Sequence, residues 1–137
     1  MTLRYLVNPE VDAGELSFLR KAVGWDERKH KLEKIVGCTY LSVACYDKQR
    51  LVGYVDVLSD GVDDAFIRGL MVDPDYQKQG IALELLNLVT ATIRKDRIKT
   101  VNVLFEPQLE PLYRKAGFRI VCGGLIDNED DHSSYQE

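Results

Sequence analysis

The chain has 137 residues, of which 45% are apolar and 29% are charged. This length is typical of one compact domain, and the composition excludes an intrinsically disordered chain, a collagen-like repeat and a coiled-coil array. The three cysteines, Cys38, Cys45 and Cys122, include no CxxC pair and lie beside no histidine cluster. We therefore expect reduced thiols, no disulfide framework and no metal site.

The net charge of −4 is unevenly distributed along the chain. Residues 127–137 hold five of the 22 acidic residues and no Lys or Arg, which leaves 17 acidic residues against all 18 basic ones in residues 1–126. We predict a single domain over residues 1–126 and an acidic, flexible tail over residues 127–137. A near-neutral domain can still concentrate positive potential at one site, so its charge does not exclude an anionic ligand.

The sequence predicts neither a membrane partner nor a nucleic-acid partner. No apolar run approaches the roughly 20 residues that a membrane span needs, and the N-terminal stretch is too short to be a signal peptide. Basic residues between positions 20 and 34 alternate with acidic ones, which is typical of a solvated helix face. We expect a cytoplasmic protein.

The first third of the chain predicts one strand followed by two helices. A strand is expected over Leu3–Val7 and a helix over Val11–Val23, where apolar residues recur at helical spacing. Asp26 is expected to cap a second, highly charged helix, which Gly37 ends.

The rest of the chain predicts a strand meander and then alternating strands and helices. Three apolar segments joined by short turns indicate antiparallel hairpins, and a wide apolar face indicates a long helix after them. In chain order, the expected strands are Tyr40–Tyr46, Leu51–Leu58, Ala65–Val72, Thr100–Phe105 and Phe118–Cys122, with Leu125 and Ile126 as a further short strand; the expected helices are Gln79–Arg94 and Leu109–Ala116. This order indicates an α/β (α+β) fold with a mixed sheet.

The junction between Val72 and the long helix predicts a phosphate-binding site. A helix start presents unpaired N–H groups and the positive end of its dipole. Gly80 adds no side chain there, Ala82 keeps the next turn small, and Lys78 adds a positive charge. A single glycine at this place is also typical of an ordinary tight connection. Neither GxxxxGK[ST] nor GxGxxG is present, which argues against an ATP loop or a Rossmann site.

Two motifs in order carry a family resemblance. The segment V-x-P-x-Y-Q-x-x-G-x-A over residues 72–82, followed by Leu-Tyr-Arg-Lys-Ala-Gly-Phe over residues 112–118, resembles the GNAT superfamily of N-acetyltransferases. The resemblance implies a mixed, mainly antiparallel central sheet of six to seven strands flanked by about four helices. In that fold, two splayed parallel strands form the cleft for coenzyme A (CoA).

The resemblance also implies which residues bind acetyl-CoA. The strand end is expected to pair its backbone with the pantetheine arm, and the loop and helix start are expected to bind the pyrophosphate through backbone amides. The implied cofactor-binding residues are Leu70, Met71 and Val72 on the strand, Gln77, Lys78, Gln79, Gly80, Ile81 and Ala82 in the loop and first turn, and Glu106, which stands where family members often have Asn.

The catalytic acid implied by the resemblance is Tyr113, which lies near the CoA sulfur in the family; its other interpretation is an aromatic side chain packed under the short helix. The general base stays open between Asp56, Asp73, Glu106 and water. Many family members carry Glu where this chain has Arg68, and an arginine cannot accept a proton at neutral pH.

The acceptor pocket is predicted less sharply than the cofactor site. Arg68 is expected either to bind a carboxylate or phosphate of the acceptor or to pair with an acidic neighbour. Trp25 is expected to be either a core anchor or part of the substrate pocket. The sequence thus predicts an N-acetyltransferase that moves the acetyl group of acetyl-CoA to a primary amine of a small molecule, peptide or protein in a ternary complex. The alternative is a catalytically weak or silent CoA-binding or CoA-sensing module of the same fold, and a homodimer is a further expectation.

Overall fold

The computed structural model describes residues 2–129, so positions 130–137 of the predicted acidic tail lie outside the described residues. The secondary-structure elements, in chain order, are β1 (Leu3–Val7), α1 (Ala13–Ala22), α2 (Lys29–Ile35), β2 (Leu41–Asp47), β3 (Arg50–Ser59), β4 (Asp64–Val72), α3 (Ile81–Lys95), β5 (Thr100–Val103) and α4 (Glu110–Lys115), with short 3-10 helices at Pro74–Tyr76 and Pro107–Leu109. Within these residues, no helix combines the length and the apolar character that crossing a membrane requires.

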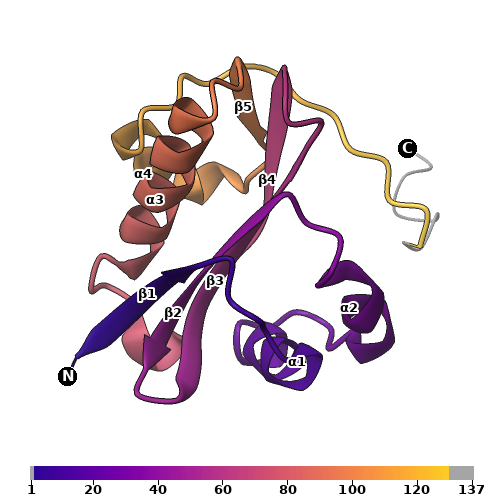
Figure 1. Cartoon of the computed structure of the whole chain (residues 1–137), viewed down its shortest axis with the longest axis vertical. Helices are drawn as coiled ribbons and strands as arrows, with labels where there is room; N and C mark the ends of the chain where they lie inside the picture. The colour runs from indigo at the N-terminus through magenta and orange to yellow at the C-terminus, as the bar shows by residue number, and fades with distance from the viewer. Residues whose placement is uncertain (1, 130–137) are drawn as a thin grey trace.

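A mixed sheet forms the centre of the molecule, with the strands in the order β1-β2-β3-β4-β5. Strands β1 to β4 are antiparallel neighbours, as the short turns between β2, β3 and β4 predict, and β5 runs parallel to β4. Helix α3 supplies the long crossover that a parallel pair needs. Figure 1 shows α3 and α4 on one side of the sheet and α1 and α2 on the other.

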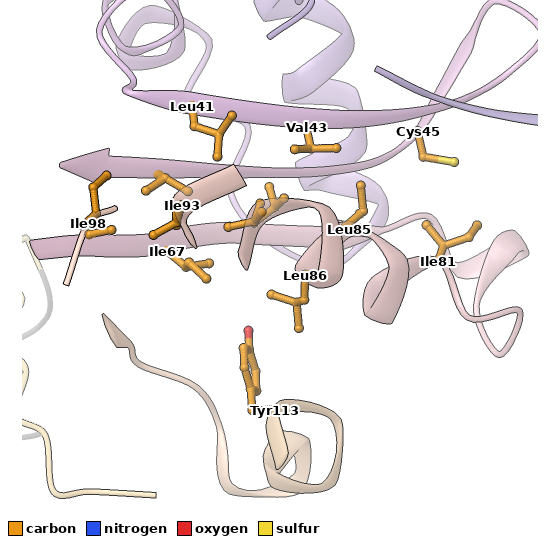
Figure 2. Packing of buried hydrophobic residues seen from close by; sticks show 14 of the residues in the cluster. Leu41, Val43, Cys45, Ile67, Ile81, Leu85, Leu86, Ile93, Ile98 and Tyr113 are labelled. Atoms are coloured by element: carbon orange, nitrogen blue, oxygen red, sulfur yellow. The ribbon is translucent and has the colours of Figure 1, made fainter. Parts of the chain in front are cut away.

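Two apolar clusters, one on each face of the sheet, hold the layers together. Helix α3 packs on the first face through one side that includes Ile81, Leu85, Leu86 and Ile93 (Figure 2). Helix α1 covers the opposite face with Leu16 and other residues, against side chains of β2, β3 and β4. Because both faces are covered, residues 41–46 are all buried, which explains why the sequence of β2 is a nearly continuous apolar run.

The start of the second helix differs from the expectation. Helix α2 has Arg28 as its N-cap residue, and no side chain caps it. The prediction that Asp26 caps this helix was wrong, because the Asp26 carboxylate accepts hydrogen bonds from Arg20 and Arg28, each at 2.9 Å.

The expectation of six to seven strands was wrong for the described residues, which form five. The predicted strand Phe118–Cys122 and the short strand at Leu125 and Ile126 do not form. Apolar β-branched residues favour extended backbone, but a strand also needs a partner for its N–H and C=O groups, and this segment forms no ladder. Val121 and the side chains after it are accordingly exposed.

Candidate active site

The two parallel strands at the edge of the sheet separate halfway along β4. Their pairing runs from Asp64 opposite Thr100 to Ile67 opposite Val103 and stops there. Strand β4 continues for five more residues beside β3, whereas the chain after β5 turns into a 3-10 helix. Beyond Ile67, the outer edge of β4 therefore has no strand partner within residues 2–129.

A β-bulge lies where the strands separate. On β3, Tyr54 pairs with Met71 and Asp56 pairs with Arg68, so Gly69 and its neighbour on β4 together face a single residue of β3. Gly69 has φ +67°, a left-handed conformation that glycine adopts without a Cβ penalty. Gly69 was not among the predicted site residues, although an isolated glycine within an apolar strand pattern is the usual signal of a bulge.

The separated strands enclose a cavity of about 600 Å³, which we call the β4–β5 cleft. Its volume lies within the usual range of small-molecule sites. The residues that line it are Trp25, Ile67, Arg68, Gly69, Leu70, Val103, Leu104, Phe105, Glu106, Pro107, Leu109, Glu110, Tyr113, Ile120, Val121, Gly123, Gly124 and Leu125. Five predicted site residues, Trp25, Arg68, Leu70, Glu106 and Tyr113, thus meet in one cavity although they come from distant parts of the chain.

Tyr113 forms part of the wall on the α3 and α4 side. Its ring stacks on Phe105 with centroids 4.5 Å apart and meets Phe118 edge to face at 5.6 Å. Figure 2 shows the hydroxyl directed from α4 toward Leu86 of α3. Burial raises the pKa of Tyr113 to about 12, which keeps the phenol protonated at neutral pH. Tyr113 is therefore available as a hydrogen-bond donor and not as a base.

Arg68 forms part of the opposite wall and pairs with a buried carboxylate. Its Nε donates to Asp56 Oδ1 at 2.8 Å, and the Tyr54 hydroxyl donates to Asp56 Oδ2 at 2.9 Å. Asp56 is only 4% exposed, and burial together with this carboxylate raises the pKa of Tyr54. The expected pairing of Arg68 with an acidic neighbour is thus confirmed.

The three carboxylates considered as general base have different environments. Both oxygens of Asp56 are engaged, as described above, and Asp73 accepts from Arg50 at 2.7 Å and from the backbone N–H of Asp75 at 2.9 Å. Neither side chain lines the cleft, whereas Glu106 does and is exposed. Glu110 also lines the cleft, and no sequence signal had indicated it.

The start of α3 has the features that an anionic group requires. Gly80 is the N-cap residue, with φ +83° and no side-chain cap. The Glu84 N–H is the first to bond back, to Gly80 O at 3.0 Å, which leaves the earlier N–H groups of the turn without helical partners. A Cβ built on Gly80 meets nothing within 4 Å, so the space outside this turn is open.

Not every predicted cofactor residue presents its side chain to this space. The Gln77 side chain donates to Val72 O at 3.1 Å and thereby ties the loop to the end of β4. Met71 is buried in the cluster under α1, which leaves only its backbone available to a ligand. Lys78 is exposed, with φ +63°. The loop therefore offers mainly backbone N–H groups and one mobile positive charge.

Trp25 lies at the cleft and not in the core. It follows α1, is 42% exposed, and has the Arg20 guanidinium 5.1 Å from its ring centroid. The interpretation as a core anchor is therefore wrong, because Arg20 and the loop hold the ring while one part of it stays open to the cleft.

Comparisons with known proteins agree with this geometry. Residues 18–129 match the family described as acetyltransferase (GNAT) domain. An uncharacterized N-acetyltransferase of Porphyra purpurea, ycf52, is 30% identical over 120 residues, which cover 83% of this chain and 69% of that protein. The soybean (Glycine max) histone acetyltransferase TAP1 is 27% identical over 128 residues, covering 85% of this chain and 55% of that protein. The chain spans 64% of the corresponding ycf52 protein of Gracilaria tenuistipitata.

Solved structures share the fold. A GNAT family acetyltransferase of Streptococcus pneumoniae superposes with a TM-score of 0.77 at 25% identity, covering 94% of this chain and all of that one. A Staphylococcus aureus protein named as a probable acetyltransferase superposes with a TM-score of 0.85 at 22% identity, covering 93% and 99% of the two chains. The family match spans most of the chain, the fold agrees with it, and the cleft lies between the splayed strands; the chain therefore belongs to the GNAT family of N-acetyltransferases.

Proposed function

We propose that this protein transfers the acetyl group of acetyl-CoA to a primary amine by direct attack in a ternary complex. The β4–β5 cleft carries the proposal, because it brings Tyr113 on the α4 side and Arg68 and Trp25 on the α1 side into one cavity. The donor and the acceptor can then approach from opposite faces of the sheet. Holding two reactants in this way supplies much of the acceleration of a bimolecular reaction.

The donor is proposed to bind along the open edge of β4 and at the start of α3. Beyond the bulge, the N–H and C=O groups on the outer edge of β4 have no strand partner among the described residues and fit an extended chain that bears amides, and the uncapped turn after Gly80 fits a pyrophosphate. Lys78 adds a positive charge beside that turn. When bound, the thioester supplies an activated acetyl group.

In the proposed reaction, a C–N bond forms between the amine and the acetyl carbon and the C–S bond breaks. An acceptor that binds as an ammonium first loses one proton to water; the neutral amine then loses a second proton as the C–N bond forms, and the sulfur gains one. The pKa of Tyr113, raised by burial to about 12, lies well above the value of about 8.5 for a thiol, so complete proton transfer from Tyr113 to the sulfur is unfavourable. Its proposed acid role is therefore a hydrogen bond to sulfur that strengthens as the C–S bond breaks.

The amine proton is proposed to leave through Glu106 or water. Among the three carboxylates considered as base, Glu106 alone lines the cleft, and Asp56 and Asp73 are paired with Arg68 and Arg50 respectively. The proposed acceptors range from small amines to protein amines. The soybean relative is named a histone acetyltransferase, which indicates a protein acceptor for that protein. A cytoplasmic location and a homodimer stay predictions.

The test is release of free CoA thiol from acetyl-CoA in the presence of a panel of primary amines, with the acetylated products identified by mass spectrometry. We expect amine-dependent release. A protein that binds acetyl-CoA tightly but turns over no amine would instead be a CoA-binding module. This alternative stays open because Arg68 stands where many family members carry a carboxylate.

A further inference from the structure

Arg68 is held in a way that leaves most of its hydrogen-bonding groups free. A guanidinium has five N–H donors. The Nε–H alone bonds Asp56, and the four N–H groups on Nη1 and Nη2 have no partner within residues 2–129. The side chain is 31% exposed and lines the β4–β5 cleft.

Asp56 orients this guanidinium without blocking its outer edge. The carboxylate is buried and receives a second hydrogen bond from Tyr54, so its position is set from two sides. Tyr54 belongs to the apolar cluster under α1, which places the Tyr54, Asp56 and Arg68 network on the α1 face of the sheet. Arg68 therefore reaches the cleft from the same face as Trp25.

The opposite wall of the cleft carries one unpaired carboxylate among the described residues. Glu106 and Glu110 both line it, but Arg114 pairs with Glu110 at 2.8 Å and offsets its charge, which leaves Glu106. An acceptor that enters from the α1 face meets the free N–H donors of Arg68 on one side and the carboxylate of Glu106 on the other. That distribution matches a molecule with an anionic group at one end and an amine, positively charged before reaction, at the other.

We infer that Arg68 binds a carboxylate of the acceptor, so that the preferred substrates are amines that also carry a carboxylate. This inference rests on the proposed acetyl transfer. The planar Nη1 and Nη2 pair fits two carboxylate oxygens, which a lysine ammonium would not match. Because Asp56 already offsets the charge of Arg68, the recognition depends on directed hydrogen bonds.

The experiment compares kcat/KM within matched pairs of acceptors. The free amines are β-alanine with propylamine and glycine with ethylamine; the peptide pair differs only in beginning with aspartate or asparagine. For each protein, the selectivity is the ratio of kcat/KM for the carboxylate member to that for its neutral partner. Comparing this ratio between variants cancels the intrinsic reactivity of each amine. The two arms distinguish a free amino acid from a peptide as the source of the carboxylate.

We expect Arg68→Gln to lower the selectivity about 10- to 100-fold in at least one arm, as loss of charge-assisted hydrogen bonds predicts. Arg68→Lys is expected to restore only part of it. The double variant Asp56→Asn/Arg68→Gln should give the same loss without leaving a buried charge unpaired. Arg50→Gln is the matched control, since Arg50 also pairs with a buried aspartate, Asp73, but does not line the cleft.

The possible negative results of this experiment contradict different parts of the proposal. If wild type turns over amines but Arg68→Gln changes both members of every pair by the same factor, the inference is wrong and the acetyltransferase function stands. If wild type binds acetyl-CoA and acetylates no amine of either kind, the proposed function is wrong, and the inference about Arg68, which rests on it, is wrong as well. An equal loss of selectivity in Arg50→Gln would also overturn the inference, because the effect would then not belong to the cleft.

Discussion

The ring of Tyr113 lies against the ring of Phe105, with centroids 4.5 Å apart and an angle of 16° between the planes. Phe105 follows β5, where the chain has left β4, and Tyr113 comes from α4. This stack ties the diverging chain to the helix behind it and so fixes one wall of the β4–β5 cleft. It also holds the phenol ring while leaving the hydroxyl unbonded to any residue between positions 2 and 129.

Replacing Tyr113 by Phe should lower kcat on the order of 10²-fold, because the hydrogen bond to the departing sulfur is lost. Phenylalanine keeps the ring and its stack on Phe105, so the affinity for acetyl-CoA should not change. Steady-state kinetics and calorimetric binding measure the two effects separately. Tyr40→Phe is the control, since the Tyr40 hydroxyl bonds Asp96 and does not line the cleft. An undiminished kcat in Tyr113→Phe would remove the proposed acid role.

Tyr113 should also make the protein lose stability in alkaline solution. Its pKa is about 12 in the folded chain and about 10 in an unfolded one, so folding favours the neutral phenol. The resulting stabilisation is complete below pH 10 and is lost as the pH rises toward 12. The unfolding free energy of wild type should therefore fall by about 2 kcal/mol relative to that of Tyr113→Phe between pH 9 and pH 12. A constant difference over that range would contradict the burial of this phenol.

Local patterns in the sequence predicted most elements of the fold. The apolar face of α3 and the three-stranded meander follow from periodicity and turns, and the structure has them within two residues or so of the expected bounds. The last strand, Phe118–Cys122, was predicted from the same kind of evidence and does not form. Apolar periodicity indicates that a segment favours an extended backbone, whereas its pairing into the sheet depends on whether an edge strand is available to it.

The parts of the candidate site that depend on local backbone geometry were predictable from motifs. The parts in which side chains from distant segments meet were less predictable. Gly80 and Tyr113 follow from the two motifs. The pairing of Arg68 with Asp56 depends on the register of β3 against β4, which the turn between Ser59 and Asp64 sets; the Gly69 bulge shifts only the pairs beyond Arg68, and sequence spacing alone left the partner of Arg68 open. Trp25 reaches the cleft through the loop after α1, and no local pattern predicts where such a loop lies.

Gly80→Ala should weaken acetyl-CoA binding more than it weakens folding. The left-handed conformation at φ +83° costs alanine about 1–2 kcal/mol, but the added methyl group meets no protein atom within 4 Å. Its new neighbour would be the bound pyrophosphate. Gly61→Ala provides the matched control, since Gly61 has φ +76° in a turn distant in sequence from α3. We expect Gly80→Ala and Gly61→Ala to lose the same stability, and only Gly80→Ala to lose affinity for acetyl-CoA. If the two variants bind acetyl-CoA equally well, the pyrophosphate binds elsewhere.

Glu106→Gln and Asp73→Asn should separate catalysis from folding. Glu106 is exposed, lines the cleft and has an unengaged carboxylate in the described part of the chain, so its amide variant should fold normally and lower kcat about 10- to 100-fold by removing the base. Asp73 is buried, accepts from Arg50 and Asp75, and does not line the cleft. Its amide variant should lower the free energy of unfolding by about 1–3 kcal/mol and leave kcat nearly unchanged.

Thermal denaturation and amine-dependent thiol release, measured on both variants, test this separation. Glu33→Gln serves as the control for Glu106, because Glu33 is an exposed glutamate of α2 outside the cleft. If Glu106→Gln keeps full kcat while Asp73→Asn loses it, the base acts from the turn after β4 and not from the end of β5. If both variants keep full kcat, neither carboxylate is the base and water takes the amine proton, since Asp56 is already bound by Arg68 and Tyr54.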